Sequence, residues 1–245
     1  MKFVSKTDVG KRRNNNEDSL FAKVYDKNVA LFIVADGLGG YESGEVASSL
    51  LVEKISKYIE ENAPLIVDYS DDKIINAIKV AIMLANDSIY RLEKTDKKYK
   101  GMGTTVVLLL KVRNKLFYVS IGDSRIYHIP KAKSKITQLT IDDTYVNELI
   151  KTNVIKEEDA CAHPQKHVIT KAVGIVKNID YSVEIFDKKS GFLLLCSDGL
   201  TNMVTEEEIL EIIKNEKLED TAEVLVDTAN KNGGADNISA IIVEL

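Results

Sequence analysis

The chain has 245 residues, of which 44% are hydrophobic and 29% are charged, and its formal net charge is −5. This composition is typical of a globular protein long enough to bury a large core, and the negative charge gives no electrostatic support for nucleic-acid binding. No apolar run approaches the ~20 residues that span a membrane, and the N-terminal sequence MKFVSKTDVG lacks the apolar segment of a signal peptide. With only two cysteines, no disulfide framework is indicated. We therefore expect a cytoplasmic protein without a membrane or nucleic-acid partner.

The first half of the chain is predicted to form three strands followed by two helices. Strand-like runs occupy about 3–8, 20–25 and 29–35. Apolar side chains then fall on one face of two helices: Val46, Leu50, Leu51, Ile55, Tyr58 and Ile59 in the first, and Ile74, Ile78, Ile82, Ala85, Ile89 and Leu92 in the second. Asp71 or Asp72 is expected to cap the second helix.

The second half of the chain repeats this order. Strand patterns are found at 104–111, 115–121, 125–129 and 135–139, then at 181–186, 192–196 and 238–243, with helices near 205–215 and 219–231. A more polar and partly helical excursion covers about 141–175. Because runs of strands alternate with pairs of helices, the order favours the α+β class with largely antiparallel pairing.

Residues 35–45, ADGLGGYESGE, form a glycine-rich segment after an apolar strand. The segment does not fit a P-loop because Glu45 stands where a lysine is needed, and it does not fit the dinucleotide fingerprint because Glu42 replaces the last glycine. Taken alone, Asp36-Gly37 is best interpreted as a turn.

Other acidic residues, however, also stand at the ends of apolar strands. They are Glu17, Asp18, Asp123, Asp198 and Asp236. Carboxylates gathered at one rim of a sheet repel one another unless a cation neutralises them. Oxygen ligands suit Mg²⁺ or Mn²⁺. A zinc site at Cys161, His163 and His167 is disfavoured because no fourth ligand is apparent, and His163-Pro164 is expected to shape a loop.

Seven segments, in this order, resemble the metal-dependent serine/threonine phosphatases of the type 2C class in their compact bacterial form. They are TDVGKRRNNNEDSL (7–20), VADGLGGYESGEVAS (34–48), GMGTTVV (101–107), YVSIGDSRIY (118–127), ITKAVG (169–174), LLLCSDGL (193–200) and GGADNIS (233–239). The resemblance implies a four-layer α-β-β-α sandwich of two mainly antiparallel β-sheets flanked by helix pairs. It also implies a single phosphatase domain over 1–245, with a flap at about 141–175.

The resemblance further implies which residues hold metal. Asp36 would bridge two Mn²⁺ or Mg²⁺ ions, and Gly37 would contribute its backbone carbonyl, which a glycine allows to come close. Asp198 and Asp236 would hold the other ion, and Asp123 matches a third, weaker position.

The residues around these ligands also have implied roles. Glu17, Asp18 and Asn237 would lie in the surrounding shell, the two acids positioning metal-bound waters. Arg13, by its spacing from Gly10 and Asp18, matches the arginine that grips the substrate phosphate, which its planar guanidinium can bond twice.

The implied reaction is hydrolysis of phosphoserine and phosphothreonine by direct attack of a metal-bridging water. No Cys-x5-Arg pattern follows Cys196, so this cysteine is interpreted as a buried strand residue rather than a nucleophile. Histidines common in the family are absent at Leu38, Tyr41 and Asp143. The proton for the leaving oxygen must then come from a water or from the Tyr41 hydroxyl, and water is favoured because an ordinary tyrosine has a pKa of about 10.

Two alternatives belong to other classes. One is a catalytically weak or inactive phosphoprotein-binding regulatory module of the same fold, which the loss of a metal aspartate would mark, and all the matched positions are present. The other is a structural domain whose Asp-Gly pairs are only turns. The expected partners are phosphorylated proteins and a cognate serine/threonine kinase, and the chain is expected to be a monomer.

Overall fold

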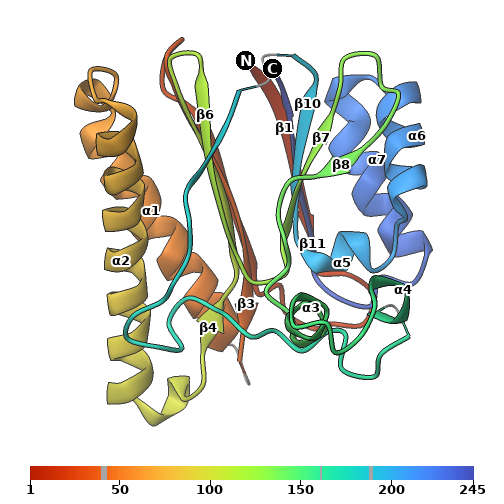
Figure 1. The fold of residues 1–245 in the computed structure, drawn as a ribbon, viewed down its shortest axis with the longest axis horizontal. Coiled ribbons are helices and arrows are strands. Elements are labelled where there is room, and N and C mark those ends of the chain that lie inside the picture. Colours follow the sequence, from red (N-terminus) through yellow and green to blue (C-terminus); the bar gives the residue numbers. More distant parts are fainter. Residues whose placement is uncertain (40–42, 161, 188–189) are drawn as a thin grey trace.

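The structure is a computed structural model that describes residues 1–39, 43–160, 162–187 and 190–245. In the first half of the chain its elements (Figure 1) are β1 (Lys2–Asp8), β2 (Asp18–Val24), β3 (Val29–Leu38), α1 (Ser43–Ile66), α2 (Asp71–Thr95), the 3-10 helix η1 (Lys97–Tyr99), β4 (Gly103–Thr104), β5 (Val106–Val112) and β6 (Lys115–Ile121). In the second half they are β7 (Arg125–Ile129), β8 (Thr137–Gln138), α3 (Tyr145–Lys151), α4 (Glu157–Ala160), β9 (Glu184–Phe186), β10 (Phe192–Cys196), α5 (Asp198–Thr201), α6 (Glu206–Asn215), α7 (Leu218–Lys231) and β11 (Ile238–Glu244).

The strands form two sheets in which neighbouring strands pair antiparallel. One sheet has the order β1-β11-β10-β7-β8, and the other has the order β2-β3-β5-β6-β9 with β4 paired to β3. Figure 1 shows the two sheets face to face, with α1 and α2 outside one and α6 and α7 outside the other. The predicted α+β class and four-layer sandwich are confirmed.

The unbroken apolar run of β3 follows from its place between two layers. Alternate strand residues point to opposite faces, so Leu31 and Ile33 pack toward α1 and α2, while Ala30 and Phe32 pack between the two sheets. All four are fully buried. Fully burying a Leu, Ile or Phe side chain contributes roughly 1.5–3 kcal/mol to stability. The helix pair is therefore fixed to the sheet mainly by contacts such as those of Leu31 and Ile33.

The other sheet uses the same alternation. In β10, Leu193 and Leu195 face the opposite sheet, whereas Leu194 packs toward α6 and α7 together with Ile209 and Leu225. The three hydrophobic clusters of the molecule therefore correspond to the three interfaces between its four layers.

Some local predictions were wrong. Ser70, not Asp71 or Asp72, is the N-cap of α2, because its side chain accepts a hydrogen bond from the Lys73 backbone N–H. The two aspartates lie in the first turn, where negative charge favours the helix dipole. Asp36-Gly37 is not a hairpin turn, since β3 continues through Gly37 and Leu38, which pair with β4.

Element boundaries also differ in places. β8 and β9 are shorter than the predicted strands at 135–139 and 181–186, and the predicted strand at 104–111 is divided into β4 and β5. The short helices η1 and α5 were not predicted.

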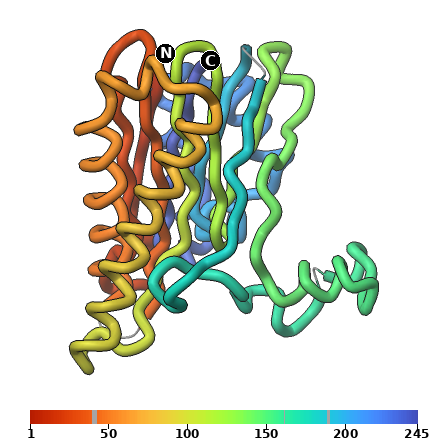
Figure 2. The backbone as a smooth tube through the Cα atoms, turned by 60° about the vertical axis from the view of Figure 1, so that its left-hand side comes forward, coloured from red at the N-terminus to blue at the C-terminus, as the bar shows by residue number. Residues whose placement is uncertain are grey.

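Residues 141–175 leave the sandwich at one end (Figure 2) and contain α3 and α4. We keep the name flap for this segment. Backbone hydrogen bonds fix it at both ends: Asp143 N–H donates to Gly122 at 2.8 Å, and Val173 N–H donates to Thr104 at 2.8 Å. Across the described residues, no helix is both long enough and apolar enough to cross a membrane.

Asn86 of α2 holds the chain where it returns from the flap. Its side chain accepts a hydrogen bond from Gly174 N–H at 2.7 Å and donates to the carbonyls of Val176 and Lys177, both at 3.0 Å. Only 3% of Asn86 is exposed, so these hydrogen bonds are made in the protein interior.

We therefore expect Asn86→Ala to lower the free energy of unfolding by about 2–3 kcal/mol, because the buried Gly174 N–H loses its acceptor. The matched control is Asp87→Ala, the next residue, whose exposed pair with Arg91 should be worth no more than about 0.5 kcal/mol. Urea unfolding of the three proteins provides the measurement. Equal midpoints for the Asn86 variant and the wild type would contradict the anchoring role.

Candidate active site

A cleft of about 530 Å³ is lined in part by Asp198 and Gly199 of α5. Figure 1 shows α5 near one end of the sandwich. The described residues that line it are Arg13, Glu17, Asp36, Gly37, Leu38, Gly39, Asp123, Lys166, His167, Ile169, Asp198, Gly199, Asn202, Met203, Ala235, Asp236 and Asn237. The cleft therefore collects residues from both sheets, from the N-terminal loop and from the flap. Asp18 is buried behind it, opposite Asp36 in the β2–β3 register.

The backbone of Asp36 is fixed by the sequence Thr104-Thr105. The Asp36 carbonyl accepts hydrogen bonds from Thr105 N–H at 2.8 Å and from the Thr104 hydroxyl at 2.9 Å, and Asp36 N–H donates to the Thr105 hydroxyl at 3.0 Å. These hydrogen bonds account for the two threonines of GMGTTVV. Together they fix the backbone of Asp36 and so the direction in which its side chain points away from the strand.

The carboxylates around Asp36 raise one another's pKa values. Loss of solvation and then the charges of Asp18, Asp198 and Asp123 hold the pKa of Asp36 well above its ordinary value. Burial raises the pKa of Asp123 to about 7, with Asp198 adding to the effect. Burial, followed by the charge of Asp236, also raises the pKa of Asp198. Negative charge in this cluster is therefore costly without a compensating cation.

Asp18 is the most enclosed of these acids. Burial raises its pKa to about 7 despite hydrogen bonds with the Ser239 and Ser197 hydroxyls, of which Ser197 donates at 2.8 Å. Within the described part of the chain, the second oxygen of Asp18, Oδ1, has no hydrogen-bond partner, and neither has Oδ1 of Asp198. Buried carboxylate oxygens without partners are rare and point to a missing water or ion.

These observations fit a hard divalent cation, for which carboxylate, carbonyl and water oxygens are the preferred ligands. Among the described His, Cys, Asp and Glu side chains, no group of three already stands in a ligating arrangement. Two of the carboxylates are engaged by other side chains: Asp236 pairs with Arg13 at 2.8 Å, and Asp198 accepts a hydrogen bond from Asn202 at 2.9 Å.

Arg13 lies at the rim of the cleft, with 51% of its side chain exposed. The hydrogen bond with Asp236 raises its pKa, so the guanidinium keeps its charge. Asn237 holds the loop that carries Arg13, donating to the carbonyls of Val9 and Asn15, both at 2.9 Å, and accepting from Glu17 N–H at 2.9 Å. Asn237 thus connects the N-terminal loop to the start of β11.

Two glycines allow backbones to meet at the site. A Cβ on Gly37 would lie 2.2 Å from the Gly44 carbonyl oxygen and 2.6 Å from that of Glu17. Gly10 has a φ of +78°, and a Cβ there would lie 2.1 Å from the Asp236 carbonyl oxygen. Both positions require glycine, and Gly10 lets the Arg13 loop pack directly on the Asp236 loop.

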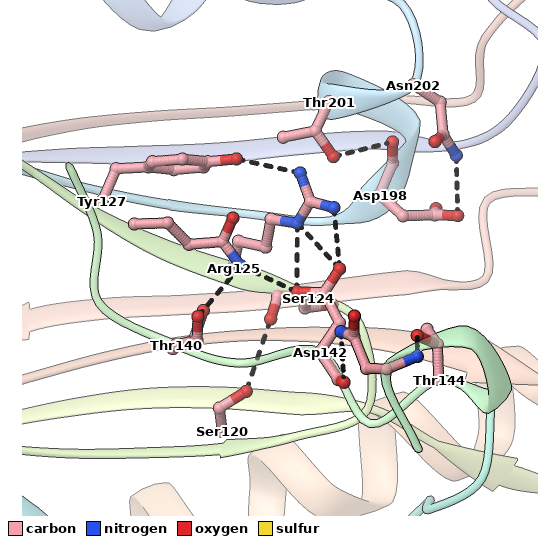
Figure 3. Close-up of polar contacts among 12 residues, drawn as sticks. Ser120, Ser124, Arg125, Tyr127, Thr140, Asp142, Thr144, Asp198, Thr201 and Asn202 are labelled. Atoms are coloured by element: carbon pink, nitrogen blue, oxygen red, sulfur yellow. Dashed lines mark hydrogen bonds and ion pairs between the residues drawn. The ribbon is translucent and has the colours of Figure 1, made fainter. Parts of the chain in front are cut away.

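A partly buried ion pair joins the flap to the strand after Asp123 (Figure 3). The Arg125 guanidinium donates to both carboxylate oxygens of Asp142, at 2.7 to 3.1 Å, and to the Tyr127 hydroxyl at 3.0 Å. Beside it, the Asp143 carboxylate accepts from Gly122 N–H at 3.2 Å and pairs with Lys171 at 3.1 Å. Asp143 therefore anchors the flap beside the Asp123 turn.

The structure brings together the predicted residues Arg13, Glu17, Asp18, Asp36, Gly37, Asp123, Asp198, Asp236 and Asn237. Tyr41 lies outside the described residues, as does Cys161. His163 stabilises its own loop, since its Nδ1 accepts a hydrogen bond from Gln165 N–H at 3.2 Å and its ring lies against Tyr145.

Cys196 is fully buried, and burial raises its pKa to about 12. It is therefore a core residue and not a nucleophile.

Sequence reasoning missed Lys166, His167 and Asn202. Asn202 follows Asp198 by four residues, a helical spacing that could have indicated the contact once α5 was recognised. No sequence signal placed the two flap residues in the cleft, because the path of the flap is set by its anchors at Asp142 and Asp143.

Comparison with known proteins agrees with this geometry. Residues 10–242 match the family of protein phosphatase 2C. The chain belongs to the protein phosphatase 2C family. It is 35% identical over 241 residues to the serine/threonine phosphatase stp of Listeria monocytogenes serotype 4b, covering 98% of this chain and 94% of that one.

Solved structures of phosphatases are also similar. The Streptococcus agalactiae serine/threonine phosphatase matches with a TM-score of 0.89 and 32% identity, covering 100% of this chain and 99% of that one. The catalytic domain of the phosphatase PstP in complex with two manganese ions matches with a TM-score of 0.83 and 30% identity, covering 99% and 97%. The chain is a metal-dependent serine/threonine protein phosphatase, and nothing in the comparisons favours the inactive alternative.

The clustered carboxylates predict an unusual stability effect. Asp36→Asn removes a carboxyl group whose pKa is raised in the folded protein, which means that ionising this group destabilises the folded state. This destabilisation is absent at low pH and grows as the pH rises above the pKa that Asp36 has in the unfolded protein. With metal removed by a chelator, we expect Asp36→Asn to raise the free energy of unfolding by about 1–2 kcal/mol at pH 8 and by less at pH 5.

Asp227→Asn on the exposed face of α7 is the control and should change stability by no more than about 0.5 kcal/mol. Urea unfolding at both pH values gives the comparison. A metal-free Asp36→Asn protein that is less stable than the wild type at pH 8 would show that the Asp36 charge is compensated by the protein itself.

Proposed function

We propose that the nine predicted site residues carry out phosphomonoester hydrolysis within one phosphatase domain spanning 1–245. The observation that carries this proposal is the meeting of Asp36, Asp123, Asp198 and Asp236 in a single cleft with Arg13 at its rim. Four carboxylates and one guanidinium suit the binding of divalent cations beside a phosphate.

Asp36, Asp198 and Asp236 would hold two Mn²⁺ or Mg²⁺ ions together with the Gly37 carbonyl, and Asp123 would hold a third, weaker one. When bound, such ions supply an activated water and stabilise charge on the phosphoryl oxygens. Glu17, Asp18 and Asn237 keep the surrounding shell in place. The support is the unpartnered Oδ1 atoms of Asp18 and Asp198 and the mutual repulsion of the cluster.

Arg13 would bind the substrate phosphate. Its guanidinium is charged and half exposed at the rim, and it is held in place by Asp236. A phosphate that enters the cleft can replace or share that contact, since a guanidinium has five N–H donors. Arg13 then orients the phosphoryl group for in-line displacement of the serine or threonine oxygen.

The leaving oxygen must gain a proton. Leu38 and Asp143 cannot act as a histidine would, and Asp143 is engaged by Gly122 and Lys171. Tyr41 stays a candidate, with water favoured because of the high ordinary pKa of tyrosine.

Other parts of the proposal concern the cellular setting. We place the enzyme in the cytoplasm as a monomer that opposes a cognate serine/threonine kinase, with the flap at 141–175 contacting the phosphoprotein. The low cysteine content and the free thiol of Cys196 are consistent with a reducing compartment.

The direct test is a phosphatase assay on phosphoserine peptides with Mn²⁺, with Mg²⁺ and with a chelator. We expect activity only with a divalent ion, and Asp36→Asn and Asp198→Asn should each lower kcat/KM more than a hundredfold while near-UV circular dichroism stays that of the wild type. If either variant retains more than a tenth of wild-type activity, the metal assignment is wrong.

Arg13 has a matched control in its neighbour Arg12, which does not line the cleft. Arg13→Ala should raise KM for phosphopeptide about tenfold or more, because the proposed contact exists in both the ground state and the transition state. Arg12→Ala should stay within twofold of the wild type. Equal losses in the two variants would mean that Arg13 is not the phosphate ligand.

A further inference from the structure

The flap contributes three residues to the wall of the cleft: Lys166, His167 and Ile169. They lie on a segment between α4 and the return of the chain to Thr104, where Lys166, His167 and Val168 are exposed. His167 lines the same cleft as Asp198. The segment therefore borders the reacting end of the cleft while facing outward.

Lys166 lines the cleft and has no ion pair in the described part of the chain. Among the described residues, no carboxylate lies within ion-pair distance of its ammonium group. Arg13, the other Lys or Arg residue among those described as lining the cleft, pairs with Asp236 at 2.8 Å, and Lys171 of the flap pairs with Asp143 at 3.1 Å. The ammonium group of Lys166 is therefore available to a ligand.

The position of Lys166 is fixed well enough to recognise a ligand. Asp143 and Thr144 hold the two arms of the flap together, through Thr170 N–H donating to the Asp143 carbonyl at 2.8 Å and the bridge between Thr144 and Ile169. Tyr145 N–H also donates to the Val168 carbonyl at 2.8 Å. These bonds lie two to four residues from Lys166 and keep its backbone at the rim.

The exposure of Lys166 indicates which part of a substrate it meets. The proposed function places the phosphoryl group among Asp36, Asp198 and Asp236, which line the cleft together with Lys166. An exposed side chain on the flap is then available to the peptide residues on either side of the phosphorylated one. An ammonium group there favours a carboxylate on the substrate.

We propose that Lys166 is a specificity-determining residue that selects substrates with an acidic side chain within a few residues of the phosphoserine or phosphothreonine. This inference rests on the proposed function, because it assumes that the phosphoryl group binds beside Asp36, Asp198 and Asp236. The substrate class is a phosphorylated segment that is acidic beside the phosphate.

The experiment uses phosphoserine peptides that differ at one position and carry Glu, Gln or Lys there, with the substitution moved through the three positions on each side. For each, kcat/KM is measured with Mn²⁺ at low ionic strength, and the Glu/Gln ratio is the readout. At one or more positions the wild type should favour Glu about threefold to fivefold, the size of a contact at an exposed site. The preference should fall as salt is added, because exposed charges are screened.

At that position Lys166→Gln should bring the Glu/Gln ratio to one, and Lys166→Glu should invert it and favour the Lys peptide. This double-mutant design isolates the pairwise contact from any general effect of the substitution. The matched control is Lys151→Gln, which removes an exposed flap lysine at the end of α3 that does not line the cleft. This variant should keep the wild-type ratio.

Three results would overturn the inference. The first is a wild-type ratio of one at every position. The second is an unchanged ratio in Lys166→Gln. The third is an equal loss with Glu, Gln and Lys peptides, which would make Lys166 a phosphate contact instead. None of these touches the proposed function, which fails separately if the wild type hydrolyses no phosphopeptide with Mn²⁺.

Discussion

The site depends on the repulsion among carboxylates placed at the ends of buried strands. Antiparallel register puts Asp18 opposite Asp36, and the face-to-face packing of the two sheets brings Asp198 and Asp123 close enough to raise the pKa of Asp36. A protein selected only for stability would not gather these charges, since each one loses solvation and gains a like-charged neighbour. Such a cluster is stable enough to fold because large apolar interfaces on both sides of each sheet compensate for it.

Other features of the molecule serve to hold that cluster in place. Thr104 and Thr105 bind the backbone of Asp36, and the Ser197 hydroxyl binds Asp18. The pairing of β1 with β11 places the N-terminal loop on the loop before β11, so that Asn237 can fix the backbone beside Arg13. Residues more than 200 positions apart thereby form one wall of the cleft.

The flap is attached to the same framework. Arg125 lies two residues after Asp123, and its bidentate pair holds the buried Asp142 carboxylate, so the chain that leaves the sheet for the flap starts from a fixed point. An Arg–carboxylate pair of this geometry is directional as well as strong. The position of the flap and the position of the Asp123 turn therefore depend on each other.

Much of the fold could be predicted because its strands bury both faces. The runs at 115–121, 125–129 and 192–196 were predicted with the observed boundaries, and the order of strands and helix pairs indicated the layers. The site aspartates could be found because each stands at or near one end of an apolar strand. The cap at Ser70 was missed because adjacent Asp residues compete for that role. The Arg125–Asp142 pair and the place of Lys166 were missed because they depend on the path of the flap, for which no periodic pattern exists.

The central claim is that the carboxylate cluster is a binding site for divalent cations, and calorimetric unfolding with and without Mn²⁺ tests it most directly. A ligand that binds only the folded protein stabilises it by about 2.7 kcal/mol at a hundred times its Kd. If the cluster binds divalent cations, the melting temperature of the wild type at pH 8 rises continuously with Mn²⁺ concentration, and that of Asp36→Asn rises far less. A folded wild-type protein whose melting temperature is unchanged by millimolar Mn²⁺ would show that the cluster is not a cation site.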